Sequence, residues 1–300
     1  MRHTTFSGLG LGLSLALLAG CSNVSELADT QQQDTTDAAS FPQATSQGAA
    51  LLSAFYGLDD AVPFFGSYRI CGEFGHTDGM PAIFSKELDT ATLQAGDFRV
   101  TLADGQSISV ACATPAPAED VGELRTMLLV GDFGSIDNQP VSVEVTGNVI
   151  SLDHRTNFKG ARVDVTRLEH GPGLVHAEVV PEEQWELDKQ ASALPFGGGS
   201  GCPAGTRQVV RVVWAGGVTK PGGDEIDDTE RSAYGVFVAG EGGELTEVTP
   251  FAIGDLGDGD NNHELCLDVT TRVVRVEFPE KLMTDPREDL NPATAVSISY

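Results

Sequence analysis

The chain has 300 residues, with 44 Asp or Glu, 18 Lys or Arg and a formal net charge of −26 at pH 7. Because no segment concentrates basic residues, nucleic acid and anionic lipid are poor partners for the folded part, and we expect no nucleic-acid partner. The acidity would suit calcium or basic partners, but the acidic residues are spread along the chain. We therefore interpret most of them as a solvated, salt-tolerant surface.

The N-terminus has the pattern of an export signal in residues 1–20. Arg2 and His3 precede an apolar stretch over residues 6–20, which is shorter than the ~20 apolar residues of a membrane-spanning helix. The ending Leu-Ala-Gly-Cys at Cys21 resembles the lipobox of bacterial lipoproteins. That resemblance implies cleavage before Cys21 and lipidation of its thiol; the alternative is an ordinary signal peptide followed by a free cysteine.

Lipidation would make the membrane a partner of the protein through acyl chains on Cys21. Each buried CH₂ contributes about 0.8 kcal/mol, so two or more chains give stable anchoring. Ser22 follows the cysteine in place of Asp, a pattern that indicates export to the outer membrane of a Gram-negative bacterium. We expect an exported, lipid-anchored protein.

The segment after the cysteine, residues 21–48, is rich in Ser, Thr, Gln, Asp and Ala and predicts a disordered tether. Residues 49–58 predict a short helix with an apolar face. That face would consist of Leu51, Leu52, Phe55 and Leu58.

From about residue 67 onward, short alternating segments separated by Gly-rich turns predict strands. One example is 98–102, a turn at Asp104 and Gly105, and 108–110, which together predict a hairpin. Further alternating segments are found at 141–145, 161–165, 209–214, 273–278 and 295–300. The order of these segments repeats along the chain, which indicates two copies of one all-β sandwich.

Residues 81–100 contain a run of the form FS..LD..TL...DF.V that resembles the opening strands of bacterial immunoglobulin-like domains. The resemblance implies that Phe84, Leu88, Leu93 and Phe98 face a core. We accordingly predict two tandem immunoglobulin-like β-sandwiches, with no catalytic residues implied. The predicted organisation is a first sandwich over 49–190, a Gly-rich linker over 191–202 and a second sandwich over 203–300.

Four further cysteines, an even number in an exported chain, predict disulfides. Three connectivities are possible, and we favour Cys71–Cys112 and Cys202–Cys266 because each pair lies within one half of the chain. The alternative is four free, buried thiols. No CxxC or Cys-His spacing favours a metal site at these residues.

The loop after residue 254 is the segment that most resembles a ligand-binding site. Asp258, Asp260 and Asn262 stand at positions 1, 3 and 5 of an EF-hand, but His263 replaces the glycine required at position 6 and no Glu follows at position 12. An EF-hand is therefore excluded.

A different calcium loop stays open beside the alternative that Asp, Gly and Asn simply form a turn. Its ligands would be Asp255, Asp258, Asp260, Asn262 and Glu264. A second acidic group at 224–228 could share an ion if the two loops met; the alternative is a solvated loop. Calcium is the single cofactor that the sequence raises.

The sequence contains no GxSxG, HExxH, Walker or dinucleotide-binding pattern, and its histidines are scattered among charged residues and glycines, where we expect exposed loops. We predict a non-enzymatic protein for binding, adhesion or scaffolding, with a protein or carbohydrate ligand. The competing class is a secreted β-sandwich hydrolase or carbohydrate-binding module that uses the acidic loops of the second domain.

Overall fold

The computed structural model describes residues 34–300 apart from 63–67, 69–70, 73–74, 76–77 and 194–196. The predicted signal peptide and Cys21 lie outside these residues. The described chain consists mainly of strands and turns, with the short α-helix α3 (Asp228–Ala233), so the all-β prediction is confirmed. None of the helices in the described part has the length and apolar character that crossing a membrane requires.

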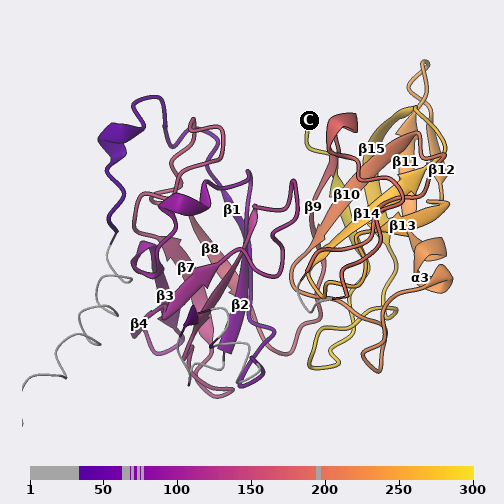
Figure 1. Ribbon diagram of the computed structural model, residues 1–300. Helices are drawn as coiled ribbons and strands as arrows, with labels where there is room; N and C mark the ends of the chain where they lie inside the picture. The colour runs from indigo at the N-terminus through magenta and orange to yellow at the C-terminus, as the bar shows by residue number, and fades with distance from the viewer. Residues whose placement is uncertain (1–33, 63–67, 69–70, 73–74, 76–77, 194–196) are drawn as a thin grey trace, which may run out of the picture.

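The strands form two units that lie side by side (Figure 1). The N-terminal unit, residues 34–168, contains one eight-stranded sheet in the order β4-β3-β7-β8-β1-β2-β6-β5. Its pairs are antiparallel except for the parallel pair β1–β8. The strands are β1 (Leu51–Phe55), β2 (Asp78–Phe84), β3 (Phe98–Leu102), β4 (Ser107–Ser109), β5 (Cys112–Thr114), β6 (Thr126–Gly131), β7 (Pro140–Val145) and β8 (Arg162–Thr166).

This sheet curves as a half-barrel around a single core. Side chains from β1, β2, β3, β6, β7 and β8 all belong to one buried cluster, in which the ring of Phe84 contacts Phe158 at 4.9 Å and Phe98 at 6.4 Å between centroids. A predicted sandwich would instead place two separate sheets face to face. For the first unit, the sandwich prediction is therefore replaced by one curved sheet.

The C-terminal unit, residues 174–300, contains two four-stranded sheets that enclose a second core. Trp214, Tyr234 and Phe278 pack together at its centre. One sheet has the order β13-β14-β10-β9 and the other β12-β11-β15-β16. The strands are β9 (Leu174–Val179), β10 (Gln208–Trp214), β11 (Gly235–Ala239), β12 (Leu245–Val248), β13 (Ala252–Gly254), β14 (Asn262–Leu267), β15 (Arg272–Phe278) and β16 (Thr294–Ser297).

The predicted boundaries between the units need correction. Strand β9 pairs with β10 over Val210↔Val179 to Trp214↔Leu174, so residues 174–190 belong to the second unit. The described residues of the predicted linker, 191–193 and 197–202, belong to that unit, where the Ser200 amide donates to the Leu256 carbonyl at 3.0 Å. Glycines indicated a flexible linker, but here they let the backbone pass close to buried side chains.

The N-terminal elements also differ from the prediction. The predicted helix at 49–58 is strand β1, because its buried residues lie on both faces of the sheet and not on one helical stripe. Within the predicted tether, the part from residue 34 packs on the N-terminal unit: Thr45 bridges to Thr156, and Asn148 Nδ2 donates to Asp34 Oδ2 at 3.0 Å. Short 3-10 helices lie in the connections: η1 (Ala38–Ser40), η2 (Thr90–Thr92), η3 (Ala95–Asp97) and η4 (Glu182–Gln184).

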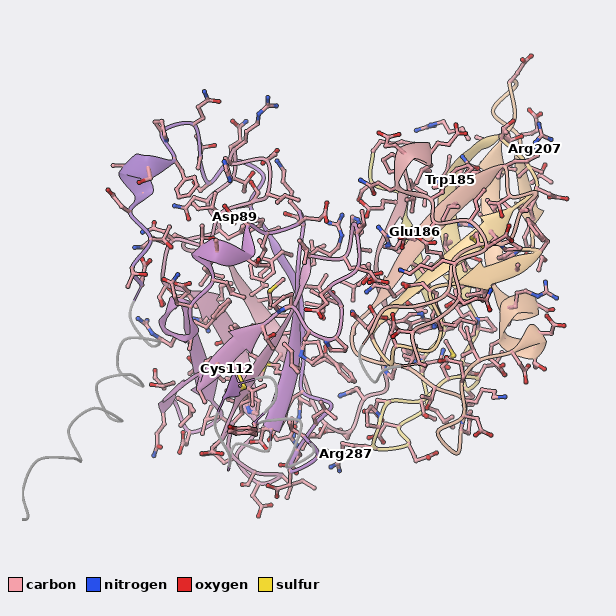
Figure 2. All side chains as sticks on the ribbon, viewed as in Figure 1. Asp89, Cys112, Trp185, Glu186, Arg207 and Arg287 are labelled. Carbon is pink, nitrogen blue, oxygen red and sulfur yellow. A yellow bond between two sulfur atoms is a disulfide. The ribbon has the colours of Figure 1, made fainter. Side chains whose placement is uncertain are left out.

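Other local predictions agree with the structure. The turn at Asp104 and Gly105 joins β3 to β4, and Phe84, Leu88 and Phe98 are buried. Both favoured disulfides, Cys71–Cys112 and Cys202–Cys266, are present; Figure 2 labels Cys112 in the N-terminal unit. The repeated segments form antiparallel pairs, β7–β8 and β15–β16, but these pairs belong to sheets of different architecture.

Asp97, the last residue of η3, is a buried acid inside the N-terminal unit. Its Oδ2 accepts a hydrogen bond from the Gln94 amide at 2.7 Å, whereas Oδ1 has no hydrogen-bond partner and faces Gly147 so closely that a Cβ there would lie 1.9 Å away. Burial raises the pKa of Asp97 to about 7, with repulsion from Asp34 adding to the rise and Lys159 opposing it.

We predict that Asp97→Asn removes a pH-dependent loss of stability. Because the folded pKa of about 7 exceeds the ordinary 3.8, the folded state binds the proton more tightly, and the free energy of unfolding falls as pH rises from about 4 to 7. Urea denaturation should show Asp97→Asn more stable than the wild type by roughly 1–3 kcal/mol at pH 8, and not at pH 4. If the variant and the wild type differed in stability by the same amount at pH 8 and at pH 4, the prediction that Asp97 titrates in this range would be contradicted.

Candidate functional site

The candidate site lies where the two units meet. The N-terminal unit contributes the loop before β6, residues 119–125, and the C-terminal unit contributes the β13–β14 loop, residues 255–261, together with the Gly-rich segment 197–201. The main chain positions these segments directly, because the Gly199 amide donates to Asp120 Oδ2 at 3.0 Å across the interface. Figure 2 labels Glu186 on the side of the C-terminal unit that faces the N-terminal unit.

One half of the interface is a set of buried ion pairs with balanced charge. Arg125 of the N-terminal unit contacts Glu178 of β9 at 2.6 Å, and Arg211 of β10 contacts Glu264 of β14 at 2.9 Å. Burial alone would raise the pKa of Glu178, but hydrogen bonds and charges from His176 and Arg125 lower it to about 2. Burial raises the pKa of Glu264 in the same way, and the charge and hydrogen bond of Arg211 oppose that rise.

Arg211 also joins the units through the main chain. Its Nη2 donates to the Val121 carbonyl at 2.8 Å, and its guanidinium lies against Gly122, where an added Cβ would be 2.0 Å from Nη1. Gly122 has φ +91°, a conformation that glycine adopts without strain. Glycine at this position therefore serves both the turn and the close approach of the arginine.

The other half of the interface is a set of buried acids that Arg211 compensates only from beyond contact distance. Glu123 is 1% exposed, and the acids of the β13–β14 loop are nearly as buried: Asp255 6%, Asp258 6% and Asp260 9%. Among the described residues, no Lys, Arg or His nitrogen lies within 4.0 Å of these four carboxylates. We name these four residues the acidic cluster.

The electrostatics of the acidic cluster reflect this imbalance. Burial raises the pKa of Glu123 to about 12, and repulsion from Asp260 and Asp255 adds to the rise. Burial also raises the pKa of Asp255 to about 7, with Asp258 contributing repulsion and Arg211 opposing it. The pKa values of Asp258 and Asp260 are raised by burial as well. Without a compensating cation, the cluster resists full ionisation at neutral pH.

The carboxylate oxygens converge in two groups that share Asp255. One group contains Glu123, Asp255 and Asp260, the other Asp120, Asp255 and Asp258, and the oxygens of each group lie within 4.8 Å of one another. Each group takes one acid from the N-terminal unit. Asp120 differs from the rest because Lys189 Nζ contacts its Oδ2 at 3.0 Å.

Several oxygens in this region have no hydrogen-bond donor. Asp255 Oδ2, Asp258 Oδ2 and Asn262 Oδ1 are buried and unpartnered. Gly199 lies against them, so closely that a Cβ would be 2.6 Å from Asp255 Oδ1 and 2.9 Å from Asp258 Oδ2. A side chain at position 199 would thus fill the space in front of the carboxylates. The glycine keeps that space open.

Cavities reach the acidic cluster from two sides. A small cavity of about 10 Å³, the size of one water molecule or ion, is lined by Glu123, Asp255 and Arg211, among others. A larger cavity of about 300 Å³ on the other side is lined by Asp255, Asp258 and Asp260 together with His263. The cluster is consequently accessible to a small ligand although its carboxylates are buried.

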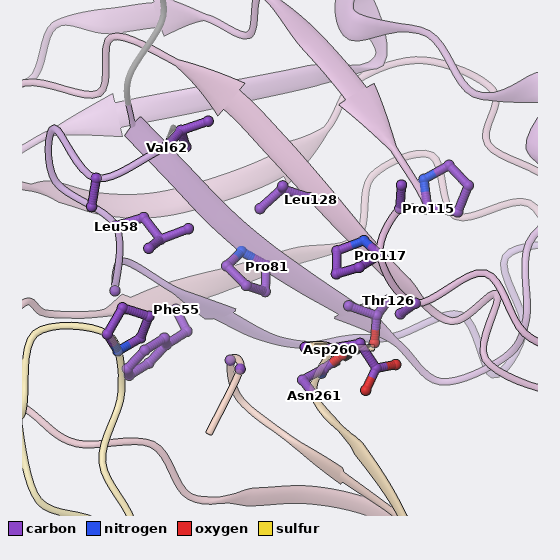
Figure 3. Close-up of a pocket in the computed structure, with 18 residues that line it drawn as sticks. Phe55, Leu58, Val62, Pro81, Pro115, Pro117, Thr126, Leu128, Asp260 and Asn261 are labelled. Atoms are coloured by element: carbon purple, nitrogen blue, oxygen red, sulfur yellow. Dashed lines mark hydrogen bonds between the residues drawn. The ribbon is translucent and has the colours of Figure 1, made fainter. Parts of the chain in front are cut away.

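An apolar pocket of about 340 Å³ adjoins the cluster between the units. Figure 3 shows Pro81 and Leu128 of the N-terminal unit opposite Asp260 and Asn261 of the C-terminal unit. Asn261 also joins the units, because its Nδ2 donates to Thr126 Oγ1 of the N-terminal unit at 3.3 Å as well as to the Trp214 carbonyl of its own unit at 2.6 Å. Apolar contact and hydrogen bonds therefore supplement the ion pairs.

The structure brings together four of the five residues of the suggested calcium loop and separates the fifth, Glu264, from them. Asp255, Asp258 and Asp260 converge, and Asn262 lies beside them, with its Nδ2 donating to Asp260 Oδ2 at 2.5 Å. Glu264 instead pairs with Arg211. The second acidic loop does meet the first, through a hydrogen bond of 3.1 Å from the Gly257 amide to Glu225.

Sequence reasoning missed Asp120 and Glu123, which come from the other unit. A signal was available, since the segment Glu-Asp-Val-Gly-Glu at 119–123 places three acids around a turn glycine. The expectation of an exposed His263 was wrong. That residue is buried, its Nδ1 lies 2.8 Å from Tyr234 Oη, and burial lowers its pKa to about 3.

No protein-family model and no curated protein matches the chain. Among solved structures, it is similar to the N-terminal part of the bacterial S-layer protein SbsC, at 11% sequence identity and a TM-score of 0.27. The match covers 84% of this chain, and the chain spans 44% of that one. So weak a likeness carries no argument about function, which must come from the residues of the site.

We predict that Arg211→Met destabilises the protein by about 3–5 kcal/mol in urea denaturation, because it leaves the buried carboxylate of Glu264 without its cation. Arg99→Met is the matched control. Arg99 pairs with Glu144 at 3.5 Å but its side chain is 53% exposed, so the loss should stay below about 1 kcal/mol. Equal losses for the two variants would show that the interface does not depend on Arg211.

Proposed function

We propose that the protein is a lipid-anchored, extracytoplasmic module for binding, adhesion or scaffolding, held at the outer membrane of a Gram-negative bacterium. The observation that carries the proposal is the buried network of Arg125, Glu178, Arg211 and Glu264, which joins the two β units into one block. A block with fixed geometry presents its surface loops in constant positions, as a binding platform requires.

Two further observations support an exterior location. The disulfides Cys71–Cys112 and Cys202–Cys266 are bonds that persist in oxidising compartments. The lipobox-like ending at Cys21 supplies the anchor. The two-sheet architecture of the C-terminal unit also supports an immunoglobulin-like identity for that unit, and such domains serve as spacers and binding platforms.

One observation favours the second candidate, a secreted hydrolase or carbohydrate-binding module. The cavity of about 300 Å³ is lined by carboxylates and by His263, which is a composition found in active sites. Two facts weigh against it: the acids are almost completely buried, and the hydrogen-bond partner of His263 Nδ1 is Tyr234 and not a nucleophile or a carboxylate. We therefore prefer the non-enzymatic proposal.

We predict that Cys21→Ala abolishes acylation and releases the protein from the membrane fraction, because the thiol is the attachment point of the acyl chains. Ser22→Ala, at the neighbouring position, should remain acylated and membrane-bound. Intact-mass measurement and membrane fractionation of the full chain distinguish these outcomes. An unmodified Cys21 in wild-type protein, or membrane binding of Cys21→Ala equal to that of the wild type, would contradict the anchoring proposal.

A further inference from the structure

We infer that the acidic cluster, together with Asp120, is a calcium site that bridges the two units, with Asp255 at its centre. The N-terminal unit supplies Glu123 or Asp120, and the C-terminal unit supplies Asp255 with Asp260 or Asp258. This ligand set differs from any loop-type site, because its members come from both halves of the chain. The inference does not depend on lipidation.

The first argument is geometric. Calcium binds oxygen ligands at about 2.3–2.6 Å, so two ligands on opposite sides of the ion are separated by about 4.8 Å. The oxygens of each group in the cluster lie within 4.8 Å of one another. The three carboxylates of a group are therefore close enough together for one ion to be shared among them after small adjustments of their side chains.

The second argument is the presence of buried oxygens that lack donors. Asp255 and Asp258 each leave one oxygen unpartnered, as does the amide oxygen of Asn262, although all three residues are more than nine-tenths buried. A buried polar atom without a partner costs about 1–3 kcal/mol, and more when it is charged. A cation held between Asp255 and Asp258 would give these two carboxylates the partner that they lack.

The third argument is charge. Arg125 and Arg211 are matched by Glu178 and Glu264, which leaves the four acids of the cluster without a contacting cation among the described residues. Burying ionised carboxylates without a cation is strongly unfavourable. A divalent ion would offset the charge of two ionised carboxylates directly, and it would favour ionisation of the other acids of the cluster, which otherwise resist it.

The ligand chemistry favours calcium over other divalent ions. All candidate ligands are carboxylate or amide oxygens, which suit hard cations, whereas zinc and copper prefer the nitrogen and sulfur ligands that are lacking in the group. The acids also come from irregular loops, where positions adjust to six to eight ligands. Magnesium requires a more regular octahedron at about 2.0–2.1 Å.

The test is a calcium titration of the purified full chain, followed by thermal melting. Because calcium would bind the folded state, the midpoint should rise with concentration, by roughly 5–10 °C at a calcium level ~100-fold above Kd. Magnesium at the same concentrations should give a smaller rise. The inference would be overturned if the melting midpoint did not rise with calcium up to about 10 mM, a concentration about tenfold above the Kd of the weakest extracellular calcium modules.

Asp255→Asn tests the centre of the site. Asn is a suitable replacement because Asp255 has φ +64°, a conformation that Asn tolerates. The variant should weaken calcium binding at least tenfold, while raising the midpoint in calcium-free buffer because one buried negative charge is removed. Asp97→Asn, a buried acid outside the cluster, is the matched control and should keep the wild-type response to calcium. Unchanged calcium affinity in Asp255→Asn would refute the site.

Glu123→Gln and Asp120→Asn test the bridging of the two units. At least one of them should weaken calcium binding about tenfold, since each oxygen group includes one of these acids. If both variants bind calcium as tightly as the wild type, the ion is held by the C-terminal loop alone, and the bridging inference is wrong. Isothermal titration calorimetry gives the affinity and the stoichiometry independently of stability.

Discussion

The arrangement of the two units depends on how the charge buried between them is compensated. Arg125 and Arg211 enter the interface from different units, and each finds a carboxylate on the C-terminal sheet. Of these pairs, Arg125–Glu178 crosses between the units, whereas Arg211 reaches the N-terminal unit through the Val121 carbonyl. Removing one partner from such a pair leaves an uncompensated buried charge, which is strongly destabilising. The same interface buries four further acids, and its geometry brings them together where a cation would complete the balance.

The C-terminal unit holds its part of the site through covalent and main-chain constraints. The Cys202–Cys266 disulfide joins the end of the Gly-rich segment to β14, the strand that follows the acidic loop. The segment then hydrogen-bonds to Leu256 and places Gly199 against the carboxylates. Closing a loop of this length stabilises a fold by roughly 4 kcal/mol in the chain-entropy model. The disulfide thus also holds the wall of the cavity in place.

Local patterns in the sequence predicted the local features. Alternation predicted the strands and the β3–β4 turn, and the resemblance to immunoglobulin-like domains implied the core positions of Phe84, Leu88 and Phe98. Features that depend on distant partners were not predictable in this way. The apolar residues of 49–58 fit a helical stripe, but a strand buried on both faces satisfies them equally well. Likewise, no pattern in the sequence around Asp255 indicates that Glu123, from the other half of the chain, lies beside it.

The chain passes once from the N-terminal to the C-terminal unit within the described residues, through the segment around Gly171 and Gly173. A single crossing with two glycines would leave the orientation of the units free, unless other contacts fix it. Gly171 is seated against the Leu290 carbonyl, where a Cβ would lie 2.1 Å away, and the ion pairs fix the rest. The residues from Asp34 onward pack on the N-terminal unit, so any anchor at Cys21 acts on that unit first. If Cys21 is lipidated, a force on the C-terminal unit would reach the membrane through the interface between the units. The acidic cluster weakens this interface by repulsion among its carboxylates, and an ion bound by both units would strengthen it there.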